Sequence, residues 1–130
     1  MRDWLAVILG GGLGALARYG ILALIPASAL PVNVLVINLL GSFFIGVVMA
    51  LVLEFGRASD EARLFLAVGL AGGFTTFSTF AEGTYSLLTL SSGLSLLYAG
   101  VSLAGGLAAV YAGMIAARLV FRRNPIQDSE

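Results

Sequence analysis

Hydroxyl and aromatic side chains gather in one stretch of the sequence, residues 72–80 (GGFTTFSTF), which interrupts an otherwise apolar segment. Phe77 and Phe80 are three residues apart and share a helical face. The edge of an aromatic ring is electropositive, so two rings presented edge-on favour an anion, although such pairs also serve plain packing. Lipid offers an opened backbone no hydrogen bond. The Gly72-Gly73 pair therefore predicts a protected break, whose carbonyls would hold a cation or face an aqueous path.

Three further polar residues stand inside apolar segments, where such side chains are costly. The Asn38 amide can donate two hydrogen bonds and accept others, which suits either a bond between helices or a ligand in a pathway. Arg18 has three open roles, because it can snorkel to the interface, pair with a carbonyl, or concentrate anions in a vestibule. Glu82 is the only acid at depth in its segment, and it can pair with Arg18 or with hydroxyls.

The composition indicates that membrane-spanning helices position these residues. Hydrophobic residues make up 59% of the 130, charged residues make up 11%, and the mean hydropathy is +1.02. Cysteine and histidine are absent, which excludes disulfides, metal sites built on those ligands, and histidine proton relays. The net charge is zero, so the chain lacks the excess of positive charge that indicates a nucleic-acid partner. The sequence predicts an all-α integral membrane protein surrounded by lipid.

Four apolar stretches are long enough to cross a bilayer as helices, which takes roughly 20 residues each. They lie at residues 4–25, 32–55, 63–90 and 94–121, with the break inside the third. The first stretch lacks the basic start and small-residue cleavage site of a signal peptide, so we expect a retained helix. Residues 1–121 would form a single four-helix transmembrane domain, and residues 122–130 a short solvated C-terminal tail.

The basic residues at the ends of the spans and in the connections fall on one side of the predicted bundle. They lie at the N-terminus, the second connection and the C-terminus: Arg2, Arg57, Arg63, Arg118, Arg122 and Arg123. The first and third connections carry no Lys or Arg. The positive-inside rule therefore predicts a multi-pass protein of the cell inner (plasma) membrane with both termini in the cytoplasm.

Glycine spacing predicts close helix packing. Gly10 and Gly14, and likewise Gly69 and Gly73, stand four residues apart, which lets helix backbones approach where lipid supplies no hydrophobic drive. Four short helices with so smooth a surface enclose little volume in a single subunit. We therefore expect an oligomer.

Three stretches together resemble one known family in their order and spacing. They are residues 11–19 (GGLGALARY), 38–46 (NLLGSFFIG) and 72–80 (GGFTTFSTF). The chain resembles the CrcB/Fluc fluoride channels at these positions, and its fourth span matches more loosely, through Tyr98 and Ser102.

The resemblance implies a fluoride-selective passive channel, not an enzyme, that exports fluoride from the cytoplasm and confers fluoride resistance. It also implies an antiparallel dual-topology dimer of four-helix subunits, with two fluoride pores and one structural sodium ion at the interface. By position, Asn38 would be the pore amide, and Phe77 and Phe80 would contact fluoride through their ring edges.

The remaining positions follow from the same resemblance. Ser78, Tyr98 and Ser102 would line a polar track in the fluoride pore, and Arg18 would lie near a vestibule. The backbone carbonyls of Gly72 and Thr75 would bind the sodium, two from each subunit. The acid that follows the third motif in the family stands one residue beyond Glu82, so no role is carried over to Glu82.

The partner subunit is left open by the charge distribution. Family members that insert in both directions have weakly biased charges, whereas this chain is strongly biased. We therefore expect either a dimer with itself or a dimer with an oppositely biased paralogue.

Other membrane classes fit the sequence less well. A small multidrug exporter also has four short helices, but it needs a titratable acid in its first span, and residues 4–25 contain none. A non-transporting scaffold would explain the glycines but not the combination of Asn38, Phe77 and Phe80. An intramembrane enzyme would need a nucleophile paired with a base, and we find no such pair.

Overall fold

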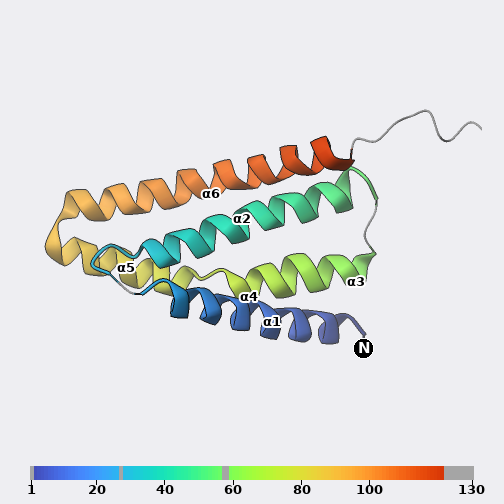
Figure 1. Cartoon of the computed structure of the whole chain (residues 1–130), viewed down its shortest axis with the longest axis horizontal. Helices are drawn as coiled ribbons and strands as arrows, with labels where there is room; N and C mark the ends of the chain where they lie inside the picture. The colour runs from blue at the N-terminus through green and yellow to red at the C-terminus, as the bar shows by residue number, and fades with distance from the viewer. Residues whose placement is uncertain (1, 27, 57–58, 122–130) are drawn as a thin grey trace, which may run out of the picture.

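The computed structural model describes residues 2–26, 28–56 and 59–121 (Figure 1). These residues form α1 (Arg2–Leu24), α2 (Val32–Leu53), α3 (Asp60–Arg63), η1 (Leu64–Ala71), α4 (Gly72–Phe74), α5 (Phe77–Leu90) and α6 (Ser92–Phe121), with no strand among them. Four spans are long and apolar enough to cross a membrane: Asp3–Leu24, Val32–Leu53, Asp60–Leu90 and Ser92–Phe121. The predicted all-helical fold with four spans is confirmed. Arg57, Arg122, Arg123 and the predicted tail 122–130 lie outside the described residues.

The four spans run up and down beside one another (Figure 1). The starts of α1 and α3 and the ends of α2 and α6 lie at one end of the molecule, and the other two connections lie at the opposite end. Helix α2 packs along α6, and α1 packs along η1 and α4, while fewer contacts join these two pairs. Arg63 and Arg118 lie at the end that carries the termini of the bundle. The side of the membrane that this end faces stays a prediction.

Glycines let the paired helices touch backbone to backbone. A Cβ atom added to Gly10 or Gly14 of α1 would collide with backbone atoms of η1, and one added to Gly73 would collide with α1. Gly46 of α2 and Gly113 of α6 meet the backbone of the opposite helix in the same way. The predicted packing role of the spaced glycines is confirmed, because each approach is too close for any larger residue.

The third span changes conformation several times along its length. Segment η1 is a π-helix, which is frequent at functional sites. After α4, Thr75 and Thr76 have extended backbone with ψ values of 161° and 121°, and α5 begins at Phe77. Thr75 is the central residue of this 31-residue span. We call Thr75 and Thr76 the extended pair.

The extended pair lies inside the predicted interruption, residues 72–80, but not at its two glycines. Gly72 is helical, with φ −64° and ψ −39°, and Gly73 lies inside α4. The prediction that this glycine pair forms the break is wrong. Opened backbone groups in a membrane need hydrogen-bond partners. Residues that lie near the threonines supply such partners, whereas glycine has no side chain that could do so.

The ends of α2 and α6 are joined by a charged and an aromatic contact. Arg118 donates two hydrogen bonds to the carboxylate of Glu54, from Nε at 2.7 Å and from Nη2 at 2.6 Å. The rings of Phe55 and Phe121 lie 6.4 Å apart beside this pair of helix ends. The hydrogen bond from Arg118 holds the pKa of the Glu54 carboxyl below its usual range. Both contacts keep α2 and α6 together at the end of the bundle away from the extended pair.

Much apolar surface is left uncovered by this packing. The buried apolar residues are few: Val34, Ile37, Val48, Ala50, Ala67, Ala71, Leu87, Tyr98 and Ala117. Large apolar side chains are exposed along α1, α5 and α6, such as Leu16, Phe77 and Leu107. Lipid tails are as apolar as leucine, so this surface suits a membrane or another subunit.

Candidate functional site

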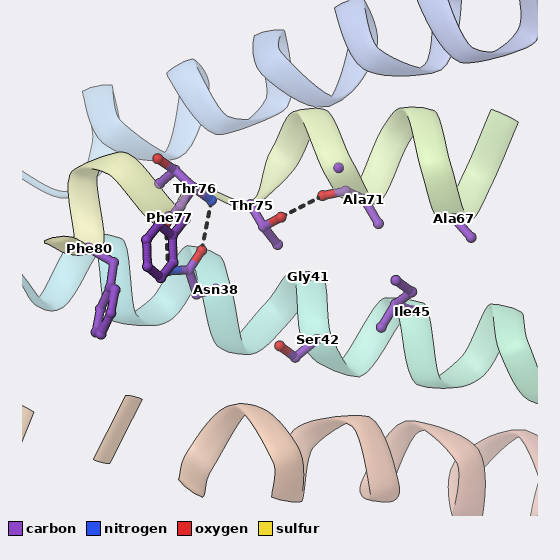
Figure 2. A pocket seen from close by; sticks show the side chains of 11 residues that line it. Asn38, Gly41, Ser42, Ile45, Ala67, Ala71, Thr75, Thr76, Phe77 and Phe80 are labelled. Carbon is purple, nitrogen blue, oxygen red and sulfur yellow. Dashed lines mark hydrogen bonds between the residues drawn. The ribbon is translucent and has the colours of Figure 1, made fainter. Parts of the chain in front are cut away.

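A groove between α2 and the third span collects many of the predicted site residues (Figure 2). Its volume is about 320 Å³. It is lined by Asn38, Gly41, Ser42 and Ile45 from α2, and by Ala67, Ala71, Gly72, Thr75, Thr76, Phe77 and Phe80 from the third span. The fold thus brings the predicted amide, both phenylalanines and both predicted sodium-binding residues to one groove. The other predicted residues, Arg18, Ser78, Tyr98 and Ser102, do not line it.

Asn38 binds the extended pair with both ends of its amide (Figure 2). Its Oδ1 accepts a hydrogen bond from the Thr76 backbone N–H at 2.9 Å, and its Nδ2 donates to the Thr76 carbonyl at 3.0 Å. The backbone N–H can only donate, so this pairing also fixes which amide atom is oxygen. The predicted hydrogen bond between helices is therefore present. An amide nitrogen carries two hydrogens, so one donor of Asn38 remains for another acceptor.

The Thr76 hydroxyl is the centre of a small cluster that begins α5. Thr76 is 7% exposed, and its Oγ1 accepts from the Thr79 N–H at 3.3 Å. The same oxygen lies 3.0 Å from Thr79 Oγ1 and 3.3 Å from Ser78 Oγ. Thr76 thus caps the helix N-terminus, a position that favours Ser and Thr. Our site prediction omitted Thr76, although a threonine directly before the start of a helix is a sequence signal for such a cap.

The carbonyls of Gly72 and Thr75 have both lost their helical donors. In a continuous α-helix they would accept from the N–H groups of Thr76 and Thr79. The Thr76 N–H donates instead to Asn38, and the Thr79 N–H donates to the Thr76 hydroxyl. The two predicted cation ligands are therefore carbonyls that side chains have released from the helix.

Arg18 reaches across from α1 to one of these carbonyls. Its Nη1 donates to the Thr75 oxygen at 3.1 Å. Of the three roles left open by the sequence, pairing with a carbonyl is the one found here. Among the described residues Glu82 has no ion pair with Arg18, so of the two partners left open for Glu82, Arg18 is not the one found here. Glu82 is exposed on α5 and lines a second cavity of about 220 Å³ with Asn33, Thr79 and others.

Three aromatic rings follow one another from the surface to α6. Phe77 is 78% exposed, and its ring centre lies 5.7 Å from that of Phe80 at a tilt of 48°. Phe80 in turn stacks on Tyr98, with ring centres 5.7 Å apart and planes 29° apart. Phe80 therefore separates the groove from α6, while Phe77 extends away from the subunit.

Two buried hydroxyls lie on α6, one of them on the ring that stacks on Phe80. The Tyr98 hydroxyl and Ser102 Oγ are one helical turn apart and close enough to interact with each other, and neither has a hydrogen bond of good geometry within the described residues. Buried polar atoms are almost always paired, and unpaired ones in a membrane protein mark candidate binding positions. The predicted pair Tyr98 and Ser102 is thus available to a polar ligand or a water molecule.

The sequence matches the model of one protein family. A sequence model described as CrcB-like protein, Camphor Resistance (CrcB), matches residues 5–114. The chain belongs to the CrcB family. This confirms the family predicted from the three motifs.

Similar proteins cover most of the chain. A protein of Thermus thermophilus, named fluoride-specific ion channel FluC, is 52% identical over 103 residues, which is 76% of this chain and 82% of the relative. A protein of Thermotoga petrophila with the same name is 40% identical over 120 residues, or 89% of this chain and 94% of the relative. These CrcB relatives are ion channels, so the chain belongs to a channel family and is not an enzyme.

Proposed function

We propose that this chain is a subunit of a passive, fluoride-selective channel. The names of its CrcB relatives support this proposal, and one structural observation carries it. Asn38, Phe77 and Phe80 line one groove, and the amide of Asn38 keeps a donor that the backbone of the extended pair does not use.

The chemistry of the groove suits fluoride. This ion is small and holds water tightly, so a selective path must replace water with compact hydrogen-bond donors. The amide of Asn38 and the ring edges of Phe77 and Phe80 are neutral, so they bind weakly enough to let the ion leave. A fixed positive charge in the narrow part of the path would risk trapping it.

We infer a path that continues past Phe80 to the unpaired hydroxyls of Tyr98 and Ser102. Each hydroxyl can donate to an anion, both are buried, and the Tyr98 ring stacks on Phe80, which borders the groove. Ser78, whose hydroxyl lies beside Thr76, belongs to the same proposed polar track. Fluoride that enters as neutral HF and dissociates inside the cell would leave by this route, which would confer resistance.

The exposed parts of the site support an antiparallel dual-topology dimer with a break in the third span at its centre. Phe77 and Gly72 are exposed in the single subunit, and a second copy or an oppositely biased paralogue would cover them. The inner membrane location, with both termini of this chain in the cytoplasm, belongs to the same proposal.

The released carbonyls of Gly72 and Thr75 fit a structural sodium ion. Hard cations prefer oxygen ligands, and neutral carbonyls can serve without an acid. The described residues contain no group of three or more Asp, Glu, His or Cys side chains that could hold a metal ion instead. Two carbonyls are few for such an ion, but two subunits would bring four, and the bound sodium would tie them together.

Ion release from liposomes tests the channel function. Vesicles that contain only this chain should release fluoride and retain chloride. Phe80→Ile should abolish most fluoride release, whereas Phe55→Ile, which removes a ring at the far end of α2, should release fluoride normally. Equal release of chloride, or no fluoride release even with an oppositely biased paralogue added, would refute the proposal.

A further inference from the structure

Arg18 is a cation inside a span whose partner is neutral. It is partly buried on α1, and its Nη1 donates a hydrogen bond to the Thr75 carbonyl at 3.1 Å. The arginines paired with acids among the described residues are Arg63 and Arg118, both near the end of the bundle that carries the termini. The charge of Arg18 is therefore balanced by no carboxylate in the part of the chain that the structure describes.

The Thr75 carbonyl needs a partner before any other subunit arrives. Its helical donor, the Thr79 N–H, is bound to the Thr76 hydroxyl. A carbonyl without a partner is costly in a membrane, because lipid offers no hydrogen bond. The Arg18 guanidinium supplies one in the single subunit.

The same carbonyl is one of the two oxygens suited to sodium. A carbonyl oxygen has two lone pairs, so it can accept from a guanidinium and bind an ion at once. The two positive charges would then share one oxygen and repel each other across a few ångströms, with little water to screen them.

We propose that Arg18 and the interfacial sodium ion compete for the Thr75 carbonyl. Arg18 occupies this oxygen in the single subunit, and the ion must bind against its charge when two subunits meet. The arginine thereby lowers the affinity for sodium and sets the sodium concentration at which the dimer becomes stable. This inference rests on the proposed sodium-bridged dimer.

The sodium dependence of the purified dimer tests the competition. The fraction of dimer in detergent is measured over a sodium series, with choline replacing sodium at constant ionic strength. Arg18→Gln removes the charge and should lower the midpoint sodium concentration at least tenfold. Arg18→Lys keeps the charge and should stay within about threefold of the original midpoint. Arg63→Gln makes the same charge change on α3, near one end of the bundle, and should leave the midpoint unchanged.

Each of the following outcomes would refute the proposed competition. An unchanged or raised midpoint in Arg18→Gln would mean that the charge does not oppose sodium. A tenfold fall in Arg18→Lys would mean that the shape of the guanidinium matters rather than its charge, and this variant also decides the question if Arg18→Gln does not fold. If the dimer fraction did not depend on sodium in any variant, both the proposed sodium ion and the proposed competition would be refuted. Fluoride release by the unaltered protein would still uphold the channel function in that case.

Discussion

Replacing Asn38 with leucine should destabilise the subunit through the backbone of Thr76. The change removes both hydrogen bonds to that backbone, at 2.9 Å and 3.0 Å, while keeping a side chain of similar size. Thr76 is 7% exposed, so water cannot replace the amide easily. An orphaned buried polar group costs about 1–3 kcal/mol, which gives about 2–6 kcal/mol for the two groups.

The bilayer moves the expected value toward the lower end of this range. Side-chain hydrogen bonds between membrane helices average only about 0.6 kcal/mol, because the unfolded chain in a membrane also finds partners. The Thr76 groups belong to extended backbone, and they lose partners that the local helix cannot supply. We therefore expect Asn38→Leu to lower the free energy of unfolding by about 2 kcal/mol.

Unfolding in mixed micelles, followed by circular dichroism while a denaturing detergent is added, measures this loss. Asn33→Leu is the matched control, because Asn33 is also buried on α2 but, within the described part of the chain, its side chain accepts a hydrogen bond from the neighbouring Val34 N–H alone, at 2.8 Å. If Asn38→Leu were no more destabilising than Asn33→Leu, the amide would not be what holds the extended pair. Its fluoride release should fall as well, since the spare donor is lost.

Three further predictions concern the interface, the packing and the helix ends. Gly72→Ala should fold normally, because nothing lies within 4 Å of the added Cβ, but the sodium dependence of the dimer should disappear, because the methyl group would stand on the surface that the second subunit is proposed to cover. Gly12→Ala has equally open space and should retain the sodium dependence. Gly46→Ala should lower the free energy of unfolding by about 1–3 kcal/mol, because its Cβ collides with the α6 backbone, and a loss below about 0.5 kcal/mol would contradict this packing. Arg118 lowers the pKa of Glu54, so their contact stabilises the fold above the usual glutamate pKa and is lost as the pH falls through the lowered value. The unfolding midpoints of the unaltered protein and Glu54→Gln should therefore differ at neutral pH and converge in acid, and a constant difference would argue against this linkage.

Features that depend on local pattern could be predicted from the sequence. Hydropathy and length were enough to predict the four spans, because each span must cross the same thickness of lipid. The spacing of Gly10 with Gly14 sufficed for a smooth helix face, since residues four apart always share a face. The three motifs sufficed for the CrcB family.

Which groups meet at the site depends on how the helices pack. The open backbone lies at Thr75 and Thr76 rather than at the glycines, because Asn38, 38 residues from Thr76, pairs with both Thr76 backbone groups. Likewise Arg18, 57 residues from Thr75, binds a carbonyl instead of Glu82. Local propensity marks where a helix can open, but the position at which it does open is set by distant side chains that satisfy the exposed backbone. That choice is made by packing, because an unpaired backbone group in lipid has no water to bind.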